Sequence, residues 1–131
     1  MFDFSRLVFR RAAVHVPEFA PLLKDGAQQA PEVVVRELTA DERRDVVRST
    51  IVRGDFAYYD MALVVYLGAV QGDLDDADKG KRLFRSVDQV RDLPGSYDAA
   101  ILRLANEVLE LSGLKERVET ESTPLELEKK A

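Results

Sequence analysis

The sequence predicts a mainly α-helical α+β fold: four to five helices around a buried central helix, a small N-terminal antiparallel β-hairpin and a flexible C-terminal tail. Three observations support this prediction. Apolar residues recur at helical spacing in several segments, the β-branched run from Val33 to Val35 indicates a strand, and the chain is charged from Lys115 onward. We therefore expect one domain over residues 1–114 and a charged, disordered tail over residues 115–131.

The N-terminal part of the chain is expected to form a helix followed by a hairpin. Residues 2–13 carry apolar side chains at helical spacing, which predicts a short amphipathic helix. Residues 14–19 alternate between apolar and polar, as is typical of a strand, and Pro17 confines that strand to an edge or an end. Residues 20–30 have the composition of a loop, and residues 33–38 predict a second strand. These strands are close enough in sequence to pair antiparallel.

Two helices of different character follow. Thr39 and Glu42 have the spacing of a capping box, in which each side chain bonds the backbone amide of the other residue, so we expect a helix over residues 40–53. Its apolar stripe is narrow. A second helix, over residues 56–70, is apolar on nearly every side and is expected to be the buried central helix. An apolar helix of this kind can also be covered by another copy of the chain.

Shorter elements occupy the next part of the sequence. Residues 72–81 have the composition of a polar, acidic turn, and residues 81–84 predict a brief extended segment. Ser86 and Gln89 again have the spacing of a capping box. They predict the start of a helix of one to two turns.

The last predicted helix covers residues 97–112, whose apolar residues fall on one face. Ser96 is expected to be its N-cap, because a serine side chain can accept a hydrogen bond from the first turn. Gly113 is expected to end the helix in a left-handed conformation.

The residue types that usually carry chemistry are absent or isolated. The chain has no cysteine, which excludes a disulfide, a thiolate nucleophile and a sulfur ligand for zinc. His15 is the one histidine, and no motif places a carboxylate beside it. The acidic run from Asp73 to Asp78 fails the ligand spacing of an EF-hand in either register, which favours a solvated turn. We therefore expect no catalytic, cofactor-binding or metal-binding residue and no enzymatic activity.

Charge and hydropathy argue against two classes of partner. The formal net charge is −5, and the basic residues are mixed with acidic ones, so nucleic acid is not the expected partner. The longest apolar run, residues 61–70, is far shorter than the roughly twenty residues that span a membrane. The N-terminus lacks the pattern of a signal peptide, so we expect the chain to stay in the cytoplasm where it is made.

Short motifs occur along the chain in a characteristic order. Their positions are Pro17 and Glu18; Arg36, Glu37 and Leu38 with Glu42 and Arg43; and Gly80 and Lys81 with Leu83 and Phe84. The predicted buried helix separates the second group from the third, and a final helix and a charged tail follow. This order, over roughly residues 7–120, resembles the tail assembly chaperones of long-tailed bacteriophages and related prophages.

The resemblance implies a role in assembly without catalysis. Such proteins bind the long, largely helical tape measure protein in the cytoplasm of the infected bacterial host. They keep it soluble and help to recruit tail tube subunits, and they are absent from the mature virion. Family members are largely helical and tend to form homo-oligomers, and the family commonly makes a longer second product by ribosomal slippage.

A partner surface is expected where apolar residues are unusually placed. Tyr58 and Tyr59 on the central helix, and Leu125 and Leu127 in the tail, are candidate contacts. A place in the core is the alternative for the tyrosines, and a plain solvated end is the alternative for the tail. Alternative functions are a head–tail connector or minor tail protein of a phage or prophage, a bacterial regulatory adaptor, and an enzyme of unrecognised type.

Overall fold

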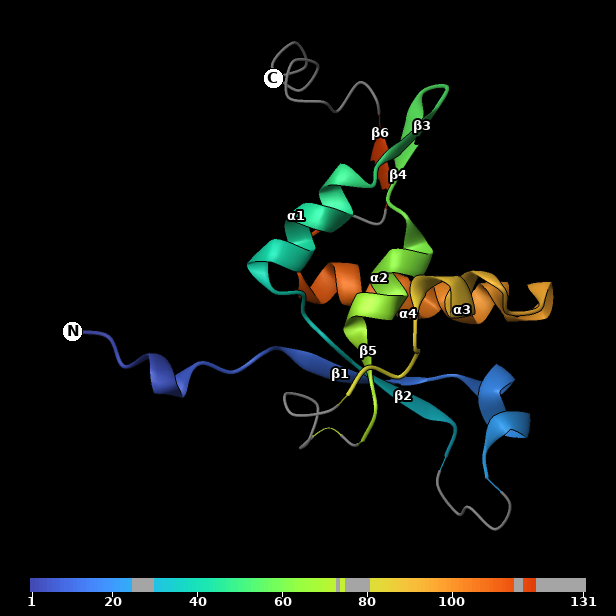
Figure 1. Cartoon of the computed structure of the whole chain (residues 1–131), viewed down its shortest axis with the longest axis horizontal. Coiled ribbons are helices and arrows are strands. Elements are labelled where there is room, and N and C mark those ends of the chain that lie inside the picture. Colours follow the sequence, from blue (N-terminus) through green and yellow to red (C-terminus); the bar gives the residue numbers. More distant parts are fainter. Residues whose placement is uncertain (25–29, 73, 75–80, 115–116, 120–131) are drawn as a thin grey trace.

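The computed structural model describes residues 1–24, 30–72, 74, 81–114 and 117–119. Within these residues the chain has a mixed α+β architecture (Figure 1), so the predicted combination of several helices with a small antiparallel sheet is confirmed. The α-helices are α1 (Ala40–Arg48), α2 (Met61–Gly68), α3 (Val87–Arg91) and α4 (Asp98–Leu111). The strands are β1 (Arg11–His15), β2 (Glu32–Arg36), β3 (Ile51–Arg53), β4 (Phe56–Tyr58), β5 (Ala69–Val70) and β6 (Arg117–Glu119). Short 3-10 helices are η1 (Phe4–Arg6), η2 (Pro17–Leu22) and η4 (Gly95–Tyr97).

The first sheet has the strand order β1–β2–β5, and all its neighbours are antiparallel. The predicted N-terminal hairpin is confirmed, because every residue of β1 pairs with a residue of β2. On its other side β2 pairs with β5, with Val34 opposite Val70 and Val35 opposite Ala69. The valines of β2 are buried on both faces of the sheet, since Val35 joins the main core and Val34 packs with Val70. This two-sided burial explains the continuous run of β-branched residues.

The predicted helix over residues 2–13 is wrong. Only the three residues of η1 are helical in this segment, and the chain becomes a strand at Arg11. Alternate side chains of that strand, Ala12 and Val14, pack against the core, whereas Ala13 is exposed. Pairing with β2 therefore overrides the helical spacing of the apolar residues.

The predicted strand over residues 14–19 is displaced, because β1 begins at Arg11 and ends at His15. Pro17 is the first residue of η2, where its missing N–H and fixed φ are tolerated. The turn closes through a hydrogen bond of 2.9 Å from the backbone amide of Phe19 to the backbone oxygen of Val16. Residues 25–29 of the predicted loop lie outside the described part of the chain.

The main core lies between the first sheet, α2 and α4. Helix α4 buries one face, and its Leu104, Val108 and Leu109 are almost fully enclosed. Helix α2 contributes the fully buried Val64 and Val65, and it packs against α3 as well as α4. The predicted helix over residues 56–70 is therefore only partly right. Asp60 caps its first turn by accepting a hydrogen bond from Leu63, so the residues before it are free to form β4.

The predicted helix over residues 40–53 is also shorter than expected. Helix α1 ends at Arg48, and β3 follows directly. Gly54 has a φ of +60°, which suits the two-residue turn that leads into β4. Strand β4 pairs on its other side with β6, so three residues of the predicted tail are a strand and residues 115–116 and 120–131 lie outside the described part. Figure 1 shows this second sheet, the β3–β4–β6 ribbon, projecting from the body beyond α1.

Of the three residues predicted to cap or end α3 and α4, two do so and one does not. The hydroxyl of Ser86 accepts a hydrogen bond from Gln89 at the start of α3, as predicted. Ser96 does not cap α4, because residues 95–97 form η4 and Tyr97 precedes the helix without a side-chain cap. Gly113 ends α4 with a φ of +72°, and the next amide bonds back to Leu109.

Candidate functional site

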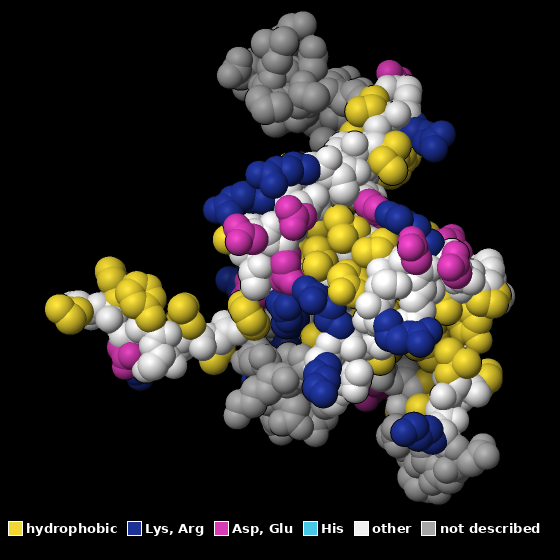
Figure 2. Space-filling view, in the orientation of Figure 1, with side chains coloured by type: hydrophobic (Ala, Val, Ile, Leu, Met, Phe, Trp, Pro, Cys, Tyr) yellow, Lys and Arg dark blue, Asp and Glu magenta, His cyan; other side chains and the backbone are white. Residues whose placement is uncertain are grey.

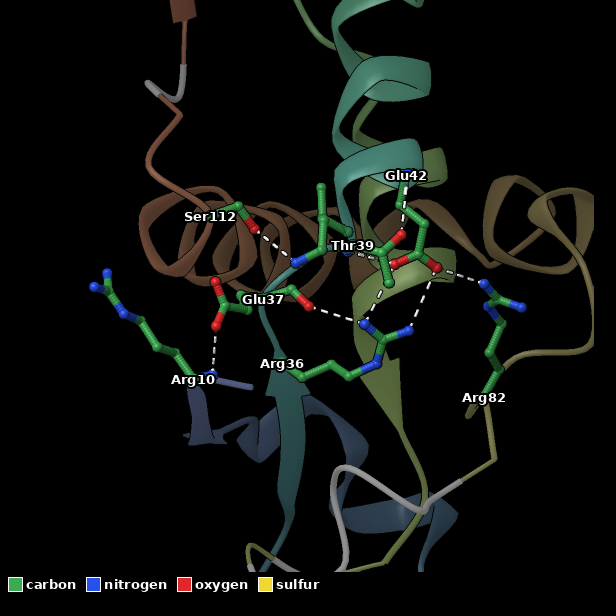
Figure 3. A network of polar contacts seen from close by, with 8 residues as sticks. Arg10, Arg36, Glu37, Thr39, Glu42, Arg82 and Ser112 are labelled. Atoms are coloured by element: carbon green, nitrogen blue, oxygen red, sulfur yellow. Dashed lines mark hydrogen bonds and ion pairs between the residues drawn. The ribbon is translucent and has the colours of Figure 1, made fainter. Parts of the chain in front are cut away.

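The motif residues Arg36 and Glu42 meet where β2 passes into α1, and Arg82 joins them (Figure 3). The two guanidinium nitrogens of Arg36 lie 3.2 and 3.3 Å from the two carboxylate oxygens of Glu42. Arg82 donates to Glu42 at 2.7 Å, to one of the two oxygens that Arg36 also contacts. Arg36 also lies 4.9 Å from the ring centroid of Phe9, and Arg82 lies 4.8 Å from that of Tyr66. Glu42 thus joins the end of β2 and the start of α1 to the segment at Arg82, which lies 40 residues further along the chain.

The same carboxylate completes the predicted capping box. It accepts the backbone amide of Thr39 at 2.9 Å, and the Thr39 hydroxyl accepts the amide of Glu42 at 3.2 Å. Burial raises the pKa of Glu42, but the Thr39 amide and the charges of Arg36 and Arg82 outweigh burial, so its pKa lies below the ordinary value of 4.5. Glu42 is therefore held as a carboxylate at neutral pH.

Further contacts attach this junction to β1 and to the end of α4. The carboxylate of Glu37 accepts the backbone amide of Arg10 at 2.7 Å. The amide of the buried Leu38 donates to the Ser112 hydroxyl at 2.9 Å, and Arg43 donates to the Ser112 backbone oxygen at 3.1 Å. Each of these bonds satisfies a polar group at an element end. The motif around residues 36–43 therefore works as a structural clamp.

The motif at Pro17 and Glu18 has a comparable role at the other end of the domain. Pro17 starts η2, and the Glu18 carboxylate receives two hydrogen bonds of 2.9 Å from Arg103 of α4. Those bonds, with the Glu18 backbone amide and the charge of Arg103, lower the pKa of Glu18 to about 2, although burial acts to raise it. The bidentate pair fixes η2 against α4.

The lowered pKa of Glu18 predicts an acid-dependent loss of stability. Because the folded pKa is about 2 and the ordinary value is 4.5, the stabilisation is complete above about pH 4.5 and is lost as the pH falls towards 2. Glu18→Gln should flatten the dependence of unfolding free energy on pH over this range, as measured by urea titration at several pH values. Glu110→Gln on α4 is the exposed control. An unchanged pH profile in Glu18→Gln would contradict the prediction.

The third motif group holds the segment after the predicted turn. The backbone oxygen of Lys81 accepts the amide of Gln71 at 2.7 Å, and the Leu83 amide donates to Ala69 at 3.0 Å. Phe84 is buried in the core, and Leu83 packs against it at the edge. Gly80 lies outside the described residues. The described motif residues are thus joined to structural partners, and they form no reactive constellation.

The candidate partner residues differ in their exposure. Tyr58 is 37% exposed on β4, whereas Tyr59 is 8% exposed in the core, which is the alternative the sequence left open. Burial raises the pKa of Tyr59 above its ordinary value, although the charge of Arg43 opposes the shift. Leu125 and Leu127 lie outside the described part of the chain. Of the two candidates that the structure describes, Tyr58 is placed where a partner can reach it.

The sequence prediction missed where most of the exposed apolar surface would lie. The N-terminal arm, which we define as residues 1–8, has Phe2, Phe4, Leu7 and Val8 each more than 70% exposed. The ribbon surface, which we define as Ile51 and Tyr58 on one face of the β3–β4 hairpin, is the second site, and Val52 is exposed on the opposite face. Figure 2 shows yellow side chains standing out from the body at both places. An amphipathic helix would have hidden the arm residues, so the wrong helix prediction concealed this feature.

Two hollows lie on the described part of the surface. One, with a volume of about 570 Å³, lies between α2, α3 and α4, and Met61, Val90 and Ile101 are among its lining residues. The other, of about 350 Å³, lies at the root of the N-terminal arm. His15 is exposed, and among the described residues no group of three acids or histidines is placed to hold a metal ion. The described helices include none with the length and apolar character needed to cross a bilayer.

Comparison with known proteins gives no assignment for this chain. No family model, curated protein or solved structure matches it.

Proposed function

We propose that this chain is a tail assembly chaperone of a long-tailed phage or prophage, acting without catalysis. It binds the tape measure protein in the bacterial host cytoplasm, keeps it soluble, helps to recruit tail tube subunits, and is absent from the mature virion. The observation that carries the proposal is the ribbon surface, an exposed apolar patch on a sheet that stands away from the body (Figure 1). The resemblance in motif order supports the identity of the client.

The ribbon surface has the form of a docking strip. Ile51 and Tyr58 are register partners, so they lie side by side on one face of the ribbon. The Phe56 ring extends this face, with its centroid 6.4 Å from that of Tyr58. Arg53, two residues after Ile51, also belongs to this face. An apolar strip with a cation at its end fits an amphipathic client helix whose apolar stripe is flanked by an acid.

Helix α2 is, in this proposal, the central buried helix and not the client surface. Its Val64, Val65 and Leu67 are buried, and it packs against α1, α3 and α4. Opening that surface would expose core residues at about 1.5–3 kcal/mol each. Client binding through the ribbon avoids this cost, because Ile51 and Tyr58 are already exposed. The clamp at Glu42 then keeps the body intact while the ribbon engages the client.

Co-expression tests the proposal directly. The chain is produced together with a candidate tape measure protein, and the soluble fraction of that client is measured by quantitative blotting. We expect Ile51→Ser with Tyr58→Ser to lower the soluble client severalfold, because both residues of the ribbon surface lose their apolar groups. The change should leave the fold intact, since both side chains are at least one-third exposed.

The control is Leu22→Ser, which removes one exposed apolar side chain from η2, away from the ribbon. It should leave the soluble client unchanged. Equal client solubility with and without the wild-type chain would contradict the chaperone role. Mass spectrometry of purified virions separates the main alternative, because a head–tail connector or minor tail protein would be found in the particle and a chaperone would not.

A further inference from the structure

The N-terminal arm is an apolar segment that the rest of its own chain leaves uncovered. Phe2 is 85% exposed and Phe4 71%, and their ring centroids lie 6.2 Å apart. Figure 1 shows the arm extending away from the body from the N-terminal end of β1, roughly in line with that strand. Such a run of apolar side chains is costly to leave in water.

The root of the arm offers a matching receptor. The hollow of about 350 Å³ is lined by Leu7, Val8, Phe9, Glu37, Leu38, Thr39 and Ala40. Most of these lining side chains are apolar, and the volume is at the lower end of the range of about 300–1,000 Å³ seen for sites that hold a small organic molecule. There is therefore room for an aromatic ring. The arm of the same chain leads away from this hollow, so its own phenylalanines are not seated there.

We propose that two copies of this chain exchange their N-terminal arms reciprocally, each seating Phe4 in the root hollow of the other. The arms run antiparallel about a two-fold axis between Arg6 and Leu7. This arrangement places Phe4 of one copy beside Phe9 of the second copy, which lines the hollow. A closed two-fold exchange uses the same surface on both copies and leaves no arm unpaired. The inference is independent of the proposed client.

The charges at the two ends of the arm and the apolar area that the arm exposes favour a second copy of the chain as the occupant of the root hollow. In the antiparallel arrangement the acidic Asp3 near the tip of one arm faces Arg10 at the root of the other, and the pair occurs twice. Figure 3 shows the Arg10 guanidinium turned away from the Glu37 carboxylate, which is occupied by the Arg10 backbone amide. Each arm has five exposed apolar side chains, which are Met1, Phe2, Phe4, Leu7 and Val8. Together they offer on the order of 700 Å², so two arms reach the range of a stable interface, about 1,200–2,000 Å².

Sedimentation velocity on the full chain at tens of micromolar tests the exchange. We expect the mass of two copies for the wild type and of one copy for Phe2→Ser with Phe4→Ser, with dimer affinity lowered at least about a hundredfold. Circular dichroism should be unchanged, because the arm contributes nothing to the core. The ribbon variant, Ile51→Ser with Tyr58→Ser, is the matched control and should stay dimeric.

Charge reversal provides a second readout. Asp3→Arg and Arg10→Asp should each weaken the dimer by about tenfold or more, and both changes in one chain should restore it, because the pair is then rebuilt with exchanged signs. The chain has no cysteine, so a Phe4→Cys, Ala40→Cys variant can report proximity. Oxidation should link two copies covalently. Linkage only within one copy would overturn the exchange.

A wild-type chain that is monomeric at tens of micromolar would overturn the inference, as would any oligomer that survives loss of both phenylalanines. An assembly larger than two copies would overturn the reciprocal arrangement. None of these measurements includes a client, so they leave the co-expression result untouched. Conversely, failure to solubilise the tape measure protein would leave the arm exchange standing.

Discussion

Replacing Glu42 by alanine is expected to lower the free energy of unfolding by about 3 kcal/mol. The carboxylate is the common acceptor for Arg36, Arg82 and the backbone amide of Thr39. Only 12% of the Glu42 side chain and 13% of the Arg36 side chain are exposed, so alanine leaves a largely buried guanidinium without its counter-charge. Loss of the capping box adds to this cost. Urea unfolding followed by circular dichroism measures the change.

Two comparison variants separate the contributions. Glu42→Gln keeps an oxygen for the Thr39 amide but removes the charge. Its free energy of unfolding should therefore lie between those of the wild type and the alanine variant. Asp45→Asn breaks an exposed ion pair with Arg48 on the same helix and should cost less than about 0.5 kcal/mol. If Glu42→Ala were no more destabilising than Asp45→Asn, the clamp would have no energetic role.

Local end signals were predictable from the sequence because they act over a few residues. The capping box of Thr39 and Glu42 depends only on their spacing, and it is present as expected. Gly113 likewise ends its helix as predicted, because a left-handed residue is best tolerated as glycine. The hairpin of β1 and β2 was also predictable, since the strands are near in sequence and only a loop separates them.

The β3–β4 hairpin was missed because an apolar run hid its boundary. Residues 56–70 are nearly all apolar, and helical periodicity cannot separate a strand from a helix within such a run. Two signals were available. Gly54 with Asp55 is a two-residue hairpin turn between apolar segments, and Asp60 is an N-cap inside the run. Together they divide the segment where the structure does.

The partners of the motif residues at the candidate site could not be predicted from the sequence. The motif residues Arg36 and Glu42 were identified, but their partner Arg82 lies 40 residues away from Glu42. Glu18 was identified without Arg103, which is 85 residues distant. Periodicity states which face of an element is buried, but it does not state which other element covers that face. The long-range partners therefore required the fold.

Replacing Gly68 by alanine is expected to destabilise the protein by about 1–2 kcal/mol, although alanine is the better helix former. A Cβ atom at this position would lie 2.5 and 2.7 Å from the two γ-carbons of Val108, where α2 crosses α4. Overpacking of this kind costs about 1–3 kcal/mol, against a gain of about 1 kcal/mol in helix propensity. Gly95→Ala is the matched control, because a Cβ there has no atom within 4 Å.

A double-mutant cycle with Val108→Ala shows whether that contact is the cause. Val108→Ala alone should cost about 2 kcal/mol through lost burial and a cavity. In the double variant the methyl group introduced by Gly68→Ala enters the space that the valine leaves, so the combined loss should be smaller than the sum by about 1–2 kcal/mol. Strict additivity in urea unfolding would place the cost of Gly68→Ala elsewhere than the α2–α4 crossing. Coupling of the expected sign would show that glycine is required there for the two helices to approach each other.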